Sequence, residues 1–409
     1  MELHESIYVV AIALSLCILV TIEVKGIMPS LRDSTLLENV VRKKMNYDII
    51  TNDKGETVSS QFLSSPIQPV ESTTALRCRF SVIIVTFNEP LLNKTVENVL
   101  ENTRPEYLYE VLIIDDQSTP PVTWDPNEKR VRIIRSDTRL GLIKARVTGG
   151  NEARGEFLAF IDAHVFVGPN WLTTPHRLLM EDPKTIVNYI NFSLDPDKFL
   201  PKKAWQGIGS SASISVDLHQ FWGGGSKTDD YSPITMGMFV TSKYWWNQGQ
   251  MDPNLKTWGG ENVEISLRTW LCGGRIVVAR DSFVAHGFRY KFPYKVNGGD
   301  ILRNYVRIAN VWLDDEYRAL FYNASNIKVK NGKVNYSFGD ISERLALKEK
   351  MNCKPFSWYA EKFKGRAMCL TRKMRPAGYK CGTVSTVTIK DLDYLTYEQQ
   401  FFKNATKQW

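Results

Sequence analysis

The sequence lacks the short motifs that mark many nucleotide-, metal- and nucleic-acid-binding proteins. It contains no G-x-G-x-x-G fingerprint and no G-x-x-x-x-G-K-[ST] loop, which argues against a dinucleotide-dependent dehydrogenase and a P-loop kinase. There is no C-x-x-C pair, so a zinc site built on thiolates is not indicated. The net charge is +8, but the basic residues are scattered and form no long run. A basic surface around an anionic small ligand is therefore favoured over nucleic-acid binding.

Charged residues are also absent from residues 6–22, which are mostly Ile, Val, Leu and Ala. This run has the length of a short membrane-spanning helix and exceeds a typical signal-peptide core. No Lys or Arg precedes it, whereas Lys25 and Arg32 follow, which argues weakly against a cytoplasmic N-terminus. We nevertheless expect residues 1–25 to be a cytoplasmic tip and transmembrane signal anchor, with a cleaved signal peptide as the alternative. Residues 26–76 are polar and lack a sustained period, so we expect a stem.

Two features favour a lumenal location in the secretory pathway. The first is a set of five N-glycosylation triplets, at Asn93, Asn191, Asn323, Asn335 and Asn404. The second is a set of five cysteines outside the apolar run, namely Cys78, Cys272, Cys353, Cys369 and Cys381. An odd number in an oxidising compartment leaves one thiol free or paired with another chain.

Apolar runs rich in Val and Ile predict an α/β fold with a mostly parallel, nucleotide-binding sheet flanked by helices. The predicted strands cover residues 81–87, 111–114, 131–134, 157–161 and 276–279, with helices over 91–100, 142–153 and 263–270. Residues 200–235 are rich in Gly, Ser and aromatics without a period, which indicates long loops over a site.

Polar side chains gather where the predicted strands end, as expected of a ligand site in an open α/β sheet. The run Phe157–Ile161 is followed by Asp162 and His164, which are two residues apart and can point to the same place. A carboxylate oxygen and an imidazole nitrogen suit Mn²⁺ better than a structural zinc. Asp115 and Asp116 follow another strand and can accept hydrogen bonds from a ribose or a base.

The stretch WGGENVEISLRTWLCGG at residues 258–274, with FIDAH before it and AHGFRYKFPY at 285–294, resembles the polypeptide N-acetylgalactosaminyltransferases. These enzymes transfer GalNAc from UDP-GalNAc to Ser or Thr of proteins, with retention of configuration. The similarity covers about residues 81–322 and resumes at 352–359. It implies a GT-A fold with a catalytic domain at 77–322 and a C-terminal extension at 323–409. We expect no ricin-like lectin domain, because the chain ends soon after residue 359. The resemblance also implies a single-pass type II protein of the Golgi membrane with a lumenal catalytic domain.

The resemblance assigns roles to individual residues. The implied Mn²⁺ ligands are Asp162, His164 and His286. The residues implied to hold the donor nucleotide are Thr86, Asp116, Arg139, Arg146, Gly237 and Tyr294. Those implied at the reacting sugar and diphosphate are Trp258, Glu261, Asn262 and Arg289. Glu261 is expected to position the sugar, because a front-face attack, in which the departing phosphate oxygen takes the acceptor proton, needs no protein base; a two-step scheme with Glu261 as nucleophile is the alternative.

The family's pairing implies a disulfide between Cys272 and Cys353, while Asp281 stands where a second family disulfide has a cysteine. We expect Cys369 to pair with Cys381. The aromatic acceptor motif F-x-W is represented by residues 214–216, and the small A-G-G motif by residues 235–237, where Met236 is expected to narrow the sugar pocket. These departures keep three alternatives open: another UDP-sugar, a non-peptide acceptor, or a homologue that binds without turnover.

Overall fold

The computed structural model describes residues 50–51, 57–59, 78–202, 212–222, 231–288, 297–330 and 333–369. The chain divides into two compact units, Met1–Arg77 and Cys78–Trp409. In the first unit, the described residues form an antiparallel pair of strands, β1 (Ile50–Thr51) and β2 (Thr57–Ser59). Among the described residues, no helix is both long and apolar enough to cross a membrane. The expected span at 6–22 lies outside these residues.

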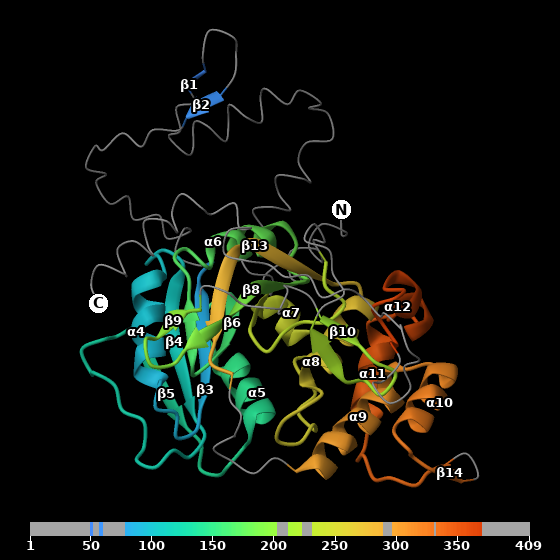
Figure 1. Cartoon of the computed structure of the whole chain (residues 1–409). Coiled ribbons are helices and arrows are strands. Elements are labelled where there is room, and N and C mark those ends of the chain that lie inside the picture. Colours follow the sequence, from blue (N-terminus) through green and yellow to red (C-terminus); the bar gives the residue numbers. More distant parts are fainter. Residues whose placement is uncertain are drawn as a thin grey trace, which may run out of the picture. The chain divides into compact units, whose positions relative to one another are not determined.

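A nine-stranded sheet forms the centre of the second unit (Figure 1). Its strands follow the order β5-β4-β3-β6-β12-β8-β13-β7, and β9 pairs with β8 outside this path. The strands are β3 (Phe80–Thr86), β4 (Leu108–Asp115), β5 (Val131–Arg135), β6 (Phe157–Asp162), β7 (Val165–Val167), β8 (Thr185–Asp195), β9 (Leu200–Pro201), β12 (Phe239–Ser242) and β13 (Arg275–His286). Each predicted strand is present, and the predicted strand at 276–279 is the first part of β13.

The sheet is mixed, which corrects the prediction of a mostly parallel one. Strands β5, β4, β3 and β6 pair in parallel, as do β8 and β13. Strand β12 is antiparallel to both β6 and β8, and β7 is antiparallel to β13. Apolar runs identify a strand that is buried on both faces but do not encode its direction, so β12 could not be oriented from its sequence.

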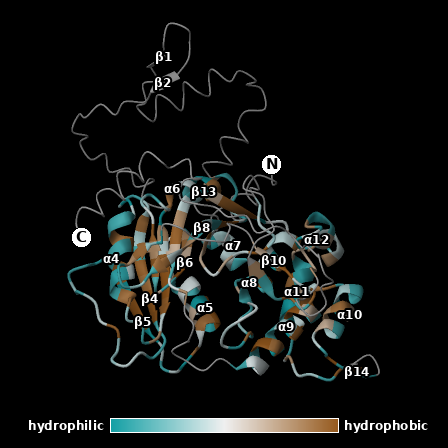
Figure 2. Ribbon diagram, viewed as in Figure 1, coloured by the Kyte–Doolittle hydropathy of each residue, from teal (hydrophilic) through white to brown (hydrophobic). Residues whose placement is uncertain are grey.

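Helices cover both faces of the sheet, and the strands between them are mainly hydrophobic in colour in Figure 2. On one face, α4 (Leu92–Asn102) and α6 (Thr173–Glu181) belong to one core with Val82, Ile84 and Val111, and α6 lies mainly against β8 and β13. On the other face, α5 (Leu142–Glu152) lies against β3 and β4, α7 (Lys243–Asn247) against β12, and α8 (Glu261–Leu271) against β13, in one core with Ile83 and Leu112. The alternation of side chains along each strand therefore supplies two separate cores.

The remaining elements extend the core around α8. They are the hairpin β10 (Ala212–Ile214) with β11 (Gln220–Trp222), the helices α9 (Gly298–Trp312), α10 (Asp315–Ala324), α11 (Ser342–Lys350) and α12 (Phe356–Lys362), and the pair β14 (Val329–Lys330) with β15 (Lys333–Val334). Phe356 and Tyr359 of α12 are fully buried in the same core as α8. The predicted loops at 200–235 thus include short strands in their described part.

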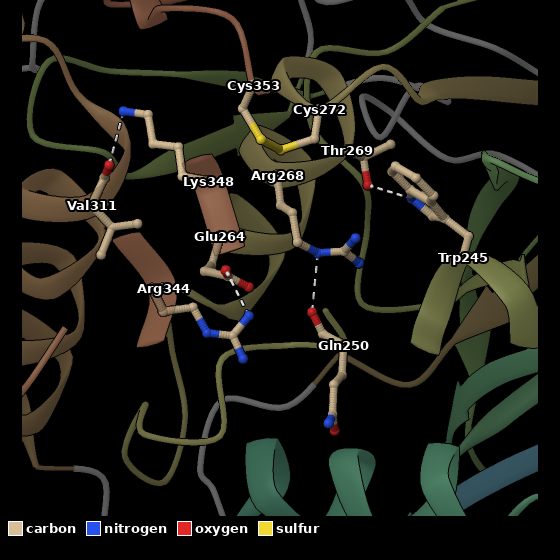
Figure 3. Close-up of a disulfide and its surroundings, with 10 residues drawn as sticks. All are labelled: Trp245, Gln250, Glu264, Arg268, Thr269, Cys272, Val311, Arg344, Lys348 and Cys353. Atoms are coloured by element: carbon tan, nitrogen blue, oxygen red, sulfur yellow. Dashed lines mark hydrogen bonds and ion pairs between the residues drawn. A yellow bond between two sulfur atoms is a disulfide. The ribbon is translucent and has the colours of Figure 1, made fainter. Parts of the chain in front are cut away.

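Helix α8 is buried along its whole length and is tied to the segments that follow it (Figure 3). The predicted disulfide is confirmed: Cys272, just after the helix, is bonded to Cys353. One turn into the helix, the Glu264 carboxylate lies 3.9 Å from a guanidinium nitrogen of Arg344 on α11. Cys369 is also in a disulfide, while its expected partner Cys381 lies outside the described residues. The Cys272–Cys353 bond holds the C-terminal end of α8, and Glu261 and Asn262 at its N-terminal end line a cavity.

Candidate active site

A cavity of about 330 Å³ lies at the carboxyl ends of β3, β4 and β6. Each predicted site residue that the structure describes lines it, namely Thr86, Asp116, Arg139, Arg146, Asp162, His164, Gly237, Trp258, Glu261, Asn262 and His286. Arg289 and Tyr294 lie outside the described residues. The lining residues come from segments that are up to about two hundred positions apart in the chain, so the sheet brings the predicted set together.

The three predicted metal ligands converge at one point of this cavity. Asp162, His164 and His286 each offer a ligand atom, and these atoms all lie within 4.8 Å of one another. Oδ2 of Asp162 is 3.3 Å from Nε2 of His286, and the two imidazole rings have centroids 4.8 Å apart. Strand pairing explains the convergence, because His286 of β13 lies opposite Val165, which directly follows His164. One carboxylate oxygen and two imidazole nitrogens fit Mn²⁺.

Glu89 also belongs to this cluster, although it was not predicted from the sequence. Its Oε2 lies 2.9 Å from Nδ1 of His164, and its side chain is only 4% exposed. A hydrogen bond at Nδ1 fixes the ring and leaves Nε2 for a metal, the arrangement seen around most metal-binding histidines. Glu89 follows β3, which pairs with β6 so that Val85 lies opposite Asp162. An acid at the end of a neighbouring strand was the signal that could have identified it.

Arg146 of α5 links the metal cluster to α8. Its Nη2 donates to Oδ1 of Asp162 at 2.8 Å, and its Nη1 lies 3.7 Å from Oε1 of Glu261. Burial opposes ionisation of Asp162, but the Arg146 guanidinium and the His286 ring outweigh it and hold the pKa of Asp162 well below its usual range. Burial raises the pKa of Glu261, and Arg146 counteracts this only in part. The two carboxylates therefore differ in proton affinity although they share one cation.

Two glycines set the position of Glu261 at the start of α8. Gly259 and Gly260 have φ angles of +96° and +89°, which only glycine adopts readily. A Cβ on Gly260 would also meet Ile308 at 2.9 Å. Within this turn, the backbone N–H of Gly259 donates a hydrogen bond to Oε2 of Glu261 at 2.8 Å. The Trp-Gly-Gly-Glu stretch thus directs a buried carboxylate into the cavity from the helix N-terminus.

The two acids that follow β4 have different roles. Asp115 is fully buried and accepts hydrogen bonds from the backbone N–H groups of Ser118 and Val122, so it stabilises a turn. Asp116 lines the cavity and accepts hydrogen bonds from the backbone N–H groups of Leu140 and Gly141, at 2.7 and 3.0 Å. Of the pair at this strand end, Asp116 is the one that a ligand can reach.

The expectation that Met236 narrows the cavity is wrong. Met236 is 1% exposed and does not line the cavity, whereas Gly237 and Met238 do. A Cβ on Gly237 would lie 3.6 Å from Nη2 of Arg146 and 3.9 Å from Oδ2 of Asp162, so this glycine lies close to the metal cluster. Met236 precedes Gly237 in a loop, and a loop has no periodic pattern that shows which of its side chains face the cavity.

The comparisons with known proteins agree with this geometry. Residues 81–241 match the family described as "Glycosyl transferase family 2". This segment is a family 2 glycosyltransferase domain. The chain is 34% identical to human polypeptide N-acetylgalactosaminyltransferase 16 over 330 residues. The aligned segment covers 73% of this chain and 57% of that protein. It is also 34% identical over 307 residues to polypeptide N-acetylgalactosaminyltransferase 3 of Drosophila melanogaster, covering 69% of this chain and 45% of that protein.

A solved structure extends the likeness to the fold. The crystal structure of GalNAc-T7 with UDP, GalNAc and Mn²⁺ has a TM-score of 0.60 and 28% identity, and covers 70% of this chain and 56% of that one. The resemblance to the polypeptide N-acetylgalactosaminyltransferases inferred from the sequence is thus confirmed over the part of the chain that these relatives cover. The chain spans about half the length of the curated relatives that it matches.

Proposed function

We propose that this protein transfers GalNAc from UDP-GalNAc to Ser or Thr hydroxyls of proteins, with retention and with Mn²⁺ as cofactor. The observation that carries the proposal is the convergence of Asp162, His164 and His286 in the cavity that also contains Asp116 and Glu261. The chain's relatives are named for the same transfer, and the neighbouring crystal structure contains UDP, GalNAc and Mn²⁺.

The cavity residues divide into three groups along such a donor. At the nucleoside end, Asp116 accepts hydrogen bonds, and the buried hydroxyl of Thr86 has no hydrogen-bond partner among the described residues. In the middle, Asp162, His164 and His286 would hold Mn²⁺, which when bound supplies positive charge to a diphosphate. At the sugar end, Trp258, Glu261 and Asn262 line the cavity.

Glu261 is best assigned to sugar positioning. Its Oε2 is held by the backbone N–H of Gly259, and its Oε1 lies near Arg146. A buried carboxylate held in this way can accept hydrogen bonds from sugar hydroxyls. In the front-face scheme, the acceptor hydroxyl oxygen bonds to the anomeric carbon as the bond to the phosphate oxygen breaks. The hydroxyl proton passes to that departing oxygen, so no protein base is required.

A second candidate is transfer from a different UDP-sugar or to a different acceptor. Met238 lines the cavity beside Gly237 and reduces the space at the sugar end. Ile214 and Val216, which stand in place of the expected acceptor aromatics, are 0% and 5% exposed and belong to the protein interior. Neither feature interferes with the nucleoside or metal groups, so UDP would remain the common part of the donor.

The test is UDP release from UDP-GalNAc and other UDP-sugars over a mixed peptide library, with Mn²⁺ or with EDTA. We expect release with UDP-GalNAc and Mn²⁺, and its loss in Asp162→Ala and His286→Ala. His176→Ala is the matched control, because this half-buried histidine lies against Phe157 and Tyr107, away from the cavity. Wild-type rates from either ligand variant would reject the site. Turnover with another donor alone would reject GalNAc and favour the second candidate.

We also propose that the protein is a type II protein of the Golgi membrane with a lumenal catalytic domain. The apolar run at 6–22 and the exposed sequon residues Asn93, Asn323 and Asn335 support this location. Co-localisation of the full chain with Golgi markers and glycosidase-sensitive mobility test it. A protein without N-glycans in the cytosolic fraction would contradict it.

A further inference from the structure

Asn191 is a buried polar residue that lines the cavity without a bonding partner. It lies on β8, is 1% exposed, and neither Oδ1 nor Nδ2 has a hydrogen-bond partner among the described residues. Asn188 on the same strand is also buried, but its Nδ2 donates to the Ile234 carbonyl at 3.2 Å and its Oδ1 accepts from the Thr235 hydroxyl at 2.8 Å. Buried amides in native proteins are normally bonded in this way. The exception at Asn191 therefore points to a ligand.

Asn191 also begins an N-glycosylation triplet, Asn191-Phe192-Ser193. The other described sequon residues, Asn93, Asn323 and Asn335, are exposed, as a glycan requires. Asn191 is 1% exposed and lies opposite Val284 of β13, in the interior of the sheet. A glycan has no room there in the folded protein. The triplet at Asn191 is thus not a modification site, and the side chain is left for the cavity.

The sheet order gives the end of the cavity at which Asn191 lies. Thr86 and Asp116 follow β3 and β4, Asp162 ends β6, and β12 and then β8 come next. A nucleotide sugar whose nucleoside lies near Asp116 and whose diphosphate lies near Asp162 extends its sugar toward β12 and β8. Asn191 lies on that side, with Met238, which directly precedes β12, as another lining residue.

The amide of Asn191 offers one acceptor and two donor hydrogens, which complement a sugar hydroxyl or an acetamido group. A second unpartnered atom, Oδ1 of Asn262, is buried in the lining of the same cavity. We infer that Asn191 is a positioning residue that binds the sugar of the UDP-sugar donor through its side-chain amide. This inference rests on the proposed function, because it takes a UDP-sugar as the ligand.

The experiment compares the binding of UDP and of UDP-GalNAc, each with Mn²⁺, by calorimetry on wild-type protein, Asn191→Ala and Asn98→Ala. We expect Asn191→Ala to weaken UDP-GalNAc binding about three- to tenfold, the effect of one lost hydrogen bond, and to leave UDP binding unchanged. Donor KM should rise by the same factor, while acceptor KM stays constant. Asn98 is the control, because its buried Oδ1 accepts from the backbone N–H of Val167 and it does not line the cavity. Asn98→Ala should lower Tm and leave both affinities unchanged.

The outcomes separate this inference from the proposed function. Equal weakening of UDP and UDP-GalNAc, or no change of either, overturns the role of Asn191. A glycan found on Asn191 by peptide mapping also overturns it. If wild-type protein releases no UDP but Asn191→Ala still weakens UDP-GalNAc binding selectively, the role of Asn191 stands and the transferase proposal fails.

Discussion

Oε2 of Glu89 lies 2.9 Å from Nδ1 of His164, and this contact fixes which ring nitrogen faces the cavity. The pair joins the segment after β3 to the segment after β6, two strands that lie side by side in the sheet. A carboxylate in this position both orients the imidazole and makes its other nitrogen a better ligand.

Removal of this carboxylate should weaken metal binding. We expect Glu89→Ala to reduce Mn²⁺ affinity roughly 10–100-fold, as is typical when the outer partner of a metal-binding histidine is lost. Glu89→Gln keeps an oxygen that can accept from Nδ1 and should lose less. Mn²⁺ titration followed by electron paramagnetic resonance measures the affinity without any need for turnover. Equal affinities in all three proteins would show that Glu89 does not orient His164.

The two methionines at 236 and 238 should behave differently. Met238→Ala removes volume from the cavity lining and should raise kcat/KM for UDP-GalNAc relative to the smaller UDP-galactose, by about tenfold. Met236→Ala creates a void in the interior away from the cavity and should lower Tm, with no change in that ratio. A changed ratio in the Met236 variant alone would restore the original expectation for that residue.

The Cys272–Cys353 disulfide should contribute to stability. It closes a loop with a sequence separation of 81 residues, and its removal by Cys272→Ser with Cys353→Ser should lower the free energy of unfolding by about 2–5 kcal/mol. Denaturant unfolding of the double variant beside the wild type measures this difference. Superimposable unfolding curves would mean that packing of α12 on α8 is sufficient by itself.

Glu264 should make stability depend on pH. Burial raises its pKa from 4.5 to about 7, although Arg344 opposes the shift. Between these two pH values the folded protein holds a proton that the unfolded chain releases. The contribution of Glu264 to the free energy of unfolding is therefore complete below about pH 4.5 and is lost as the pH rises to about 7. As the pH rises from about 4.5 to 7, Tm should fall less in Glu264→Gln than in the wild type. Glu343→Gln, which changes an exposed acid that also pairs with Arg344, is the control and should follow the wild type.

The sequence predicted the strands and the metal cluster better than it predicted buried polar contacts. Asp162 and His164 could be identified because a spacing of two on a strand places both side chains on one face. His286 needed the family resemblance, since nothing in its local sequence shows that β13 pairs with β7, which directly follows His164. Glu89 was missed because a lone acid in a sequence carries no information on its burial. Asn191 was read as a glycosylation site because the triplet that begins with it likewise does not show that it is buried. The strand β12, four residues long and antiparallel to its neighbours, was not predicted at all, because so short a run carries no clear periodic pattern.

The attachment of α8 to the chain that follows it determines where this protein can be shortened. The family 2 match ends at residue 241, before Glu261, which lines the cavity, and before His286, the last predicted metal ligand. A fragment cut after β13 would retain all three ligands, yet it would expose the thiol of Cys272 and leave Glu264 buried without the guanidinium of Arg344. We therefore expect the shortest stable fragment of this protein to extend beyond the family 2 match and to reach at least to α12.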